Sequence, residues 1–282
     1  MLFSKIVDNE ISFHGSPNPG NRSFGRFSRP LLEGYFNNLI QTCNKGKSLV
    51  VAEIFCYFKG FCRLYSCFCL LDQKYKRGVI QQTFSSERKN SNSSFPEWKP
   101  SRFEDYFTEQ SIRTSNNAST PLVSLTVEEG ITPKTERYYR EFLVTKGEDN
   151  YKAIKPGWFA YNPMNAHLGA IAPNHLGYTA SVSGYYNVFS VNEEDTICFW
   201  EEYLTAYPML IHYKLIATGS LIEKQRVHYS QFVKICRKLP SVDEQRYLSK
   251  MFEIINNKIS NAEKMQYQLT MLRSFFMKQL FI

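Results

Sequence analysis

The hydrophobic pattern is most regular at the end of the chain, in residues 239–282. From Leu248 onward, steps of four and three residues place apolar side chains on one stripe, interrupted only by Gln266 and Arg273. This is the spacing of a coiled-coil seam. The candidate helix-pairing residues on this stripe are Leu248, Phe252, Ile255, Ile259, Leu269 and Phe276.

The start of this helix is also marked in the sequence. Ser241 and Glu244 form an S-x-x-E capping box directly after Pro240. A helix of roughly 40 residues spans about 60 Å, which is more than the preceding domain needs for its own core. We therefore predict another long helix as its partner. The alternative is a terminal helix that folds back on its own domain.

Residues 95–238 show a different pattern, with short apolar or alternating runs separated by Gly, Pro and Asn. Such runs indicate β-strands. Two helices are expected among them, one over 103–109 with Glu104 assisting its cap, and one over 195–215 that Pro208 should kink or break. The pattern predicts an α+β domain followed by the long helix.

The first part of the chain has poor periodicity. Residues 1–70 suggest only a short helix over 31–42, and no fold can be assigned to the rest. Residues 71–84 have the pattern of the end of a helix, and 85–94 are a polar linker rich in Ser and Asn. We therefore divide the chain into segments 1–70, 71–94, 95–238 and 239–282.

Charge is unevenly distributed along the chain, whose net charge is +8. Residues 1–90 carry 13 Lys and Arg against 6 acidic residues, whereas residues 91–240 carry 15 against 16. If the middle domain binds DNA, a local basic face must do so, because counterion release depends on the cations that reach phosphates.

Several classes of function lack their signature. The seven cysteines show no zinc spacing, the histidines have no metal-spaced partners, and no phosphate loop or hydrolase motif is present. The acidic run of Glu193, Glu194 and Asp195 fits the first turn of the following helix. We expect no catalytic residue, no metal and no cofactor. The stretch 50–71 carries too many charges to span a membrane, and no signal peptide is found, so the expected location is the cytoplasm.

Several segments, in order, resemble the DNA-specificity (S) subunit of type I restriction-modification enzymes. FPEWKPSRFEDYF from Phe95 is similar to the start of a target recognition domain, and YKAIKPGWFAYNPM, GAIAP and SVSGYYNVF are similar to its central strands. ATGSLIEKQRVHYSQFVKICRKLPSVDEQ resembles the exit into the conserved spacer helix. The resemblance covers roughly 71–282. It implies a mixed-sheet target recognition domain followed by a long coiled-coil helix.

The resemblance also implies partners. A complete subunit has two recognition domains, each reading one half of a split DNA target, held apart by two long helices that pair antiparallel and dock the methyltransferase subunits, which in turn bind the restriction subunit. Residues 1–70 do not match a first recognition domain, and 71–84 match only the tail of the first helix. With that partner shortened, a homodimer through Leu248, Phe252, Ile255 and Ile259 is the expected substitute.

Three clusters are candidates for DNA contact, because duplex recognition needs cations at phosphates and donor or acceptor pairs at base edges. They are centred on KTERYYR, on the segment after Tyr161 and on the TGSLIEKQR segment. Two of them have a structural alternative: a solvated loop for the first and an ordinary Asn-Pro turn for the second. The candidate residues are Lys134, Arg137, Tyr139, Arg140, Asn162, Asn165, Thr218, Ser220, Lys224 and Arg226.

The hypothesis from the sequence is therefore a non-catalytic, sequence-specific DNA-binding subunit. Its main rival is a fragment that acts only through helix pairing or subunit docking and binds no DNA. A stand-alone nuclease or methylase ranks third, since Asn162-Pro163-Met164 departs from the Asn-Pro-Pro-aromatic signature of adenine methyltransferases.

Overall fold

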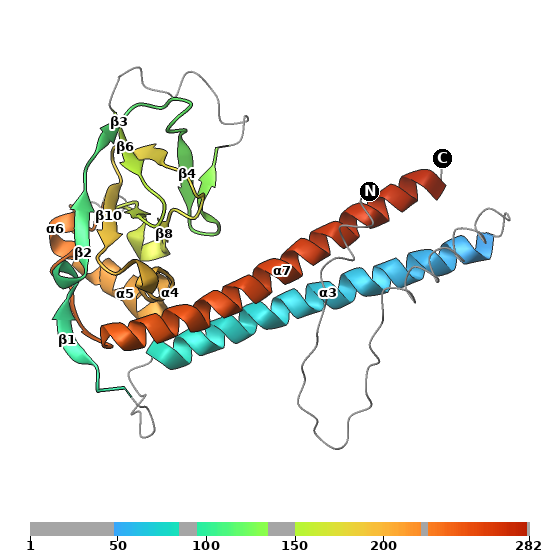
Figure 1. The fold of residues 1–282 in the computed structure, drawn as a ribbon, viewed down its shortest axis with the longest axis horizontal. Helices are drawn as coiled ribbons and strands as arrows, with labels where there is room; N and C mark the ends of the chain where they lie inside the picture. The colour runs from blue at the N-terminus through green and yellow to red at the C-terminus, as the bar shows by residue number, and fades with distance from the viewer. Residues whose placement is uncertain (1–47, 85–94, 135–149, 221–224, 281–282) are drawn as a thin grey trace. The chain divides into compact units, whose positions relative to one another are not determined.

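The computed structural model describes residues 48–84, 95–134, 150–220 and 225–280 (Figure 1). The chain divides into two compact units. The helical unit consists of Met1–Gln73 and Lys258–Ile282, and the sheet unit consists of Lys74–Asn257. Two long helices, α3 (Ser48–Phe84) and α7 (Val242–Leu280), each contribute to both units.

The sheet unit is α+β, as predicted, and its strands pair antiparallel. Its largest sheet has the order β2-β10-β7-β8, and a smaller sheet has the order β3-β6-β9. Two further ladders join β1 to β11 and β4 to β5, and a parallel bridge links Leu122 to Ser181. The strands are β1 (Lys99–Arg102), β2 (Phe107–Gln110), β3 (Arg113–Thr114), β4 (Val123–Thr126), β5 (Gly130–Pro133), β6 (Tyr151–Ile154), β7 (Phe159–Tyr161), β8 (Ile171–Pro173), β9 (Ala180–Ser183), β10 (Asn187–Val191) and β11 (Cys236–Leu239).

The core lies on both faces of the largest sheet. β7 is buried throughout, because its alternate side chains enter two different clusters. Phe159 and Tyr161 face a large aromatic cluster with Phe189 and Trp200, whereas Ala160 faces a smaller aliphatic cluster. Helices α4 (Ile197–Thr205) and α5 (Tyr207–Ile216) close the aromatic side. This explains why the strand is a continuous apolar run.

The helix expected over 103–109 is replaced by a short 3-10 turn, η1 (Phe103–Asp105), and strand β2. The helical spacing of Phe103 and Phe107 suggested a helix, yet both side chains are buried and their backbones bond elsewhere. Phe103 N–H donates to the Ile235 carbonyl (3.1 Å), and Phe107 pairs with Val191 across β10. Tertiary pairing therefore overrides local periodicity here, and Asp105 rather than Glu104 accepts the capping N–H (3.1 Å).

The expected interruption of the 195–215 helix is confirmed. A 3-10 turn, η4 (Glu194–Thr196), leads into α4, and the chain is extended at Ala206 before α5 begins at Tyr207. Pro208 lies in the first turn of α5, where its missing N–H costs nothing. The break falls two residues before the proline. Short helices η3 (Ala166–Leu168) and α6 (Tyr229–Phe232) complete the unit.

In the helical unit, α3 and α7 run antiparallel (Figure 1). Gln266 Nε2 donates to Ser66 Oγ (2.8 Å), Gln73 Nε2 donates to Glu263 Oε1 (3.2 Å), and Lys258 pairs with Asp72 (3.0 Å). Residues later in α3 contact residues earlier in α7, as expected for antiparallel helices. Helix α3 begins at Ser48, within a segment to which the sequence pattern assigned no fold. The short helix suggested over 31–42 lies outside the described residues.

Only one of the two hydrogen bonds of the predicted capping box is seen at the start of α7, the bond to the Ser241 side chain. Glu244 N–H donates to Ser241 Oγ (3.3 Å), while the Glu244 carboxylate accepts a hydrogen bond from Trp98 Nε1 (3.2 Å). The box residue therefore also ties the N-terminus of α7 to the segment before β1.

The seam of α7 faces its own chain. Leu248 and Phe252 are buried in the aromatic cluster of the sheet unit, where Val79, Ile80 and Phe84 of α3 also pack. Farther along, Ile255, Ile259 and Leu269 are half-buried, and Phe276 lies beyond the side chains that the structure describes. Gln266, at one seam position, contacts Ser66 of α3, and α3 is much longer than its sequence pattern suggested. Pairing of the seam with a second copy stays a prediction.

Candidate nucleic-acid interface

Three connecting segments meet at one end of the largest sheet. There β7 ends at Tyr161, β10 begins at Asn187 opposite it, and β2 ends at Gln110 opposite Val188. We call the segments 161–170, 183–187 and 217–227, of which 221–224 are not described, the loop edge.

The first and third segments of the loop edge are bonded to each other. Val227 N–H donates to the Pro163 carbonyl (2.9 Å), and Tyr161 Oη donates to the Val227 carbonyl (3.1 Å). Burial raises the pKa of the Tyr161 phenol, so it remains a donor at physiological pH. The segments around Asn162 and Arg226 were predicted from the sequence as two separate clusters. In the fold they lie next to each other.

The two asparagines of the second cluster differ in their surroundings. Asn162 Oδ1 accepts the Met164 N–H (3.1 Å), and the Asn165 carbonyl accepts the N–H groups of Leu168 (3.0 Å) and Ala170 (3.1 Å). Bidentate pairing with adenine needs both the amide oxygen and the amide nitrogen, and the Asn162 oxygen serves the turn. Asn165 has an exposed side chain and stays a candidate.

The third cluster forms a narrow loop. Thr218 and Arg226 exchange backbone hydrogen bonds of 3.0 and 2.9 Å, which closes the loop at its base. Thr218 and Ser220 are exposed, and Arg226 is half-buried. Lys224 lies outside the described residues. The Arg226 guanidinium carbon is 5.4 Å from the centroid of the Tyr185 ring, within cation–π range.

The turn that carries Tyr185 is held on several sides. Gly184 N–H donates to the Asn150 carbonyl (3.1 Å), and Tyr186 N–H donates to the Ser183 carbonyl (2.9 Å). The ammonium of the buried Lys152 donates to the Tyr186 carbonyl (2.7 Å), and burial lowers its pKa.

Sequence reasoning missed Tyr185, Lys152 and Arg113. Arg113 and Lys152 are register partners on β3 and β6, beside the turn. Two signals were available: adjacent tyrosines after a glycine in SVSGYYN, and a lysine inside the apolar strand YKAI. Neither signal alone indicates which residue the side chain contacts in the fold.

The first predicted cluster is described only at its start. Lys134 follows β5 and is half-buried. Arg137, Tyr139 and Arg140 lie outside the described residues. The structure therefore gives no account of this cluster as a group.

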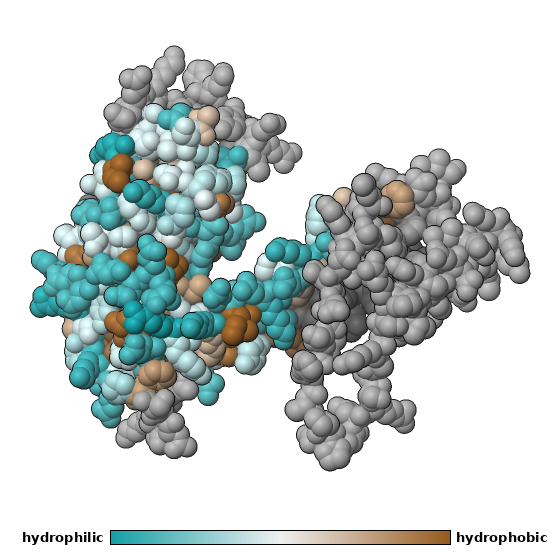
Figure 2. All heavy atoms as spheres, in the orientation of Figure 1, coloured by the Kyte–Doolittle hydropathy of each residue, from teal (hydrophilic) through white to brown (hydrophobic). Residues whose placement is uncertain are grey.

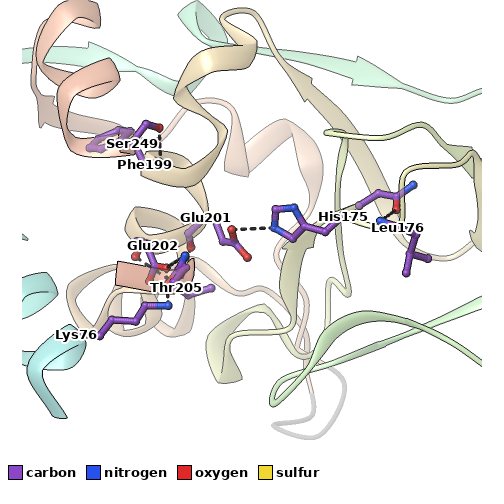
Figure 3. Close-up of polar contacts among 10 residues, drawn as sticks. Lys76, His175, Leu176, Phe199, Glu201, Glu202, Thr205 and Ser249 are labelled. Carbon is purple, nitrogen blue, oxygen red and sulfur yellow. Dashed lines mark hydrogen bonds and ion pairs between the residues drawn. The ribbon is translucent and has the colours of Figure 1, made fainter. Parts of the chain in front are cut away.

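A second polar centre surrounds α4 (Figure 3). Glu202 is 2.6 Å from Lys76 Nζ and accepts a hydrogen bond from Asn256 (3.2 Å). The Phe199 N–H lies in the first turn of α4, where amides have no acceptor within the helix. It donates to Ser249 Oγ (2.9 Å). On the other side, His175 Nε2 and Glu201 Oε2 are 3.0 Å apart. The contacts of Glu202 and Phe199 join α4 to the parts of α3 and α7 that belong to the sheet unit, and that of Glu201 joins it to the segment after β8.

The acidic run 193–195 serves a structural role at the same helices. Arg246 pairs with Glu193 (2.6 Å) and with Asp195 (2.6 Å). Within the described ranges, no group of three or more His, Cys, Asp or Glu is arranged to hold a metal ion. Burial raises the pKa of the Cys198 thiol to about 11, which disfavours the reactive thiolate.

The surface of the sheet unit is mainly hydrophilic on the face that Figure 2 shows, with hydrophobic spots scattered singly. Exposed apolar side chains of this unit include Ile112, Val127 and Leu168. Single exposed apolar residues are normal for a globular surface. No helix in the part of the chain that the structure describes is both long and apolar enough to cross a membrane.

The fold thus defines a protein with a small α+β domain and an antiparallel pair of long helices. It has the fold of type I restriction-modification S subunits. The S subunit from M. genitalium superposes with a TM-score of 0.53 at 12% identity, covering 82% of this chain and 59% of that one. The HsdS subunit from Thermoanaerobacter tengcongensis gives 0.47 at 11% identity, covering 82% and 56%.

The chain therefore spans less than two thirds of the length of these structures. No family model matches the sequence, and a search of the curated proteins finds no significant match. The similarity lies in the three-dimensional arrangement of the chain. At 11–12% sequence identity it establishes the fold alone.

Proposed function

We propose that this chain is a non-catalytic specificity subunit, or half of one, of a type I restriction-modification complex. The sheet unit binds double-stranded DNA through the loop edge and reads one half-site. The long helices dock the methyltransferase subunits, and through them the restriction subunit. The chemistry belongs to these partners.

The observation that carries the proposal is the loop edge in an S-subunit-like fold. Arg226 lies there over an aromatic ring, next to a turn with the exposed Asn165 and a loop with the exposed Thr218 and Ser220. Guanidinium, amide and hydroxyl groups are the side chains that contact base edges and phosphates. This local arrangement supports DNA binding although the middle of the chain has almost no net charge.

The remaining sequence candidates extend the same proposal. Lys134, Arg137, Tyr139, Arg140 and Lys224 are cations and phenols suited to phosphate contact. Asn162 is the weakest of the candidates, because its amide oxygen already accepts a hydrogen bond within its turn.

The direct test measures binding of the purified chain to duplex DNA over a range of salt concentrations. We expect log K to fall with log salt by roughly 0.9 for each phosphate contacted, together with a preference for one short half-site. Mapping genomic methylation with and without the chain, beside its methyltransferase, then identifies the sequence read. Purified chain that cuts or methylates DNA by itself would contradict the non-catalytic assignment.

A second candidate function is docking without DNA recognition. The observation that favours it is the apolar surface of α7 outside its seam: Ile254 is 70% exposed, Tyr267 66% and Met271 52%. Side chains of this kind fit a protein partner. Absence of DNA binding at low and high salt, with retained methyltransferase binding, would favour this candidate over the first.

A further inference from the structure

The backbone around Arg226 is fixed on both sides. Its own N–H and carbonyl both bond to Thr218, and the next residue, Val227, bonds to Pro163 and to Tyr161. Four hydrogen bonds therefore hold the backbone N–H and carbonyl groups of two consecutive residues. The Cα of Arg226 is anchored to the sheet although it belongs to a loop.

The turn that carries the ring under Arg226 is anchored as well. Tyr185 lies in the turn between β9 and β10, whose carbonyl at Tyr186 accepts the buried Lys152 ammonium (2.7 Å). A Cβ on Gly184 would lie 2.3 Å from the Asn150 carbonyl oxygen, so the turn packs closely against its neighbour. Tyr185 is 40% exposed. Its ring therefore lies at the surface of the unit on a turn whose backbone is held in place.

A guanidinium can contact an aromatic ring and a pair of hydrogen-bond acceptors at the same time, because it uses different parts of its structure for each. Its flat face lies against an aromatic ring, whereas its N–H donors project in the plane and match a pair of acceptors. An arginine held by its face loses less side-chain entropy when its donors engage a ligand. The Arg226 guanidinium lies over the Tyr185 ring, so the ring can take the first kind of contact and leave the N–H donors for the second.

We propose that Tyr185 is a positioning residue that holds Arg226 as a preset fork for two acceptor atoms of DNA. The inference rests on the proposed DNA-binding function and adds the side chain that gives the contact its geometry. Two acceptor pairs have the required chemistry: O6 and N7 of guanine in the major groove, and two oxygens of one phosphate. They differ in their dependence on salt and on base sequence.

The test uses the full chain and two 30-base-pair duplexes, one with the site found by methylation mapping and one with that site scrambled. Tyr185→Leu, which removes the ring, should weaken binding to the mapped site by on the order of 3- to 30-fold. Tyr185→Phe keeps the ring and should bind within about twofold of the wild type. Tyr178→Leu is the matched control, since Tyr178 is also 40% exposed, and its affinity should not change.

Arg226 variants distinguish the two acceptor pairs. Arg226→Lys keeps the charge but loses the fork, and we expect it to weaken binding at least about tenfold. If the acceptor is a phosphate, Arg226→Ala should lower the salt slope by about 0.9 and affect both duplexes equally. If it is guanine, the slope should stay within error while discrimination against the scrambled duplex falls. In the Arg226→Ala background, Tyr185→Leu should add no further loss.

Three results would overturn the proposal, and they separate it from the broader function. Wild-type binding that Arg226→Ala leaves unchanged removes the fork but not the DNA-binding function. Loss in Arg226→Ala with none in Tyr185→Leu removes the positioning role alone. Failure of the wild type to bind either duplex at low salt removes the DNA-binding function itself. Thermal melts of each variant identify a loss that arises from unfolding.

Discussion

The ammonium of Lys76 lies 2.6 Å from the carboxylate of Glu202, which is one of the most buried charges in the sheet unit. Lys76 comes from α3 and Glu202 from α4, and Asn256 of α7 donates to the same carboxylate (3.2 Å). Burial raises the pKa of Glu202, and the neighbouring Lys76 opposes that rise. The buried Glu202 carboxylate thus links α4 to both α3 and α7.

Lys76→Met should therefore destabilise the sheet unit by about 3 kcal/mol, because it leaves a buried carboxylate without its cation. Urea denaturation measures the change. The double variant Lys76→Met with Glu202→Gln should recover much of the loss, since a neutral amide needs no cation. Lys74→Met is the control, because Lys74 is exposed on the same helix. Equal losses in the Lys74 and Lys76 variants would show that charge pairing is not the cause.

The contact between His175 and Glu201 should make stability depend on pH. The Glu201 carboxylate raises the pKa of His175 above its usual 6.5. The protonated form is thus favoured in the folded state, so its contribution is complete below about 6.5 and disappears as pH rises through the folded pKa. The His175 side chain is 59% exposed, which limits the effect to under about 1 kcal/mol.

Chemical denaturation of the wild type and of His175→Gln between acidic and alkaline pH measures this contribution. The two proteins should differ most at the acidic end, with the wild type more stable, and converge at the alkaline end. A difference that is constant with pH would mean that protonation of His175 is not involved.

Two glycines should respond to alanine in opposite directions. Gly184→Ala places a Cβ 2.3 Å from a backbone oxygen and should cost about 1–3 kcal/mol, as overpacking does. Gly78→Ala, in α3, meets nothing within 4 Å and should stabilise by about 0.5–1 kcal/mol because glycine is a poor helix former. Thermal unfolding of both variants tests the pair. Stability unchanged in Gly184→Ala would show that the turn can move away from Asn150.

Ile259→Lys should weaken the pairing of α7 with α3, because Ile259 is a half-buried seam position. We expect lost helicity at lower temperature in circular dichroism, with no change in mass by light scattering, since the partner helix is in the same chain. Ile254→Lys, at a position 70% exposed on the same helix, should leave the melt unchanged. A fall in mass for Ile259→Lys would instead indicate a seam between two copies.

Helix α7 was predicted well from the sequence because its signals are local. The Ser241 cap and the four-and-three spacing after Leu248 depend on residues within one or two turns of each other. The strands of residues 95–238 and the break before Pro208 followed from equally local preferences. The same reasoning failed at Phe103 and Phe107, whose spacing fits a helix but whose backbone pairs with distant strands.

The candidate site was predicted in part. Arg226, Asn165 and the loop around Thr218 were identified because guanidinium, amide and flexible glycine are visible residue by residue. Tyr185 and Lys152 were not, since an exposed ring and a buried ammonium acquire meaning only from what packs beside them. Sequence alone also left the two clusters around Asn162 and Arg226 separate, because their link, Val227 to Pro163 and to the Tyr161 hydroxyl, joins segments that are distant in the chain.

The α+β class was predictable from the sequence, as were the long C-terminal helix and its apolar stripe, since these follow from side-chain periodicity along a single segment. What lies against that stripe and what lies under Arg226 depend on contacts between segments that are distant in the chain. Ser66, Asp72 and Gln73 of α3 contact α7, although the sequence pattern before residue 71 predicted no helix there. Arg226 meets Tyr185 because β7 ends beside the start of β10, a relationship that exists only after the sheet has formed.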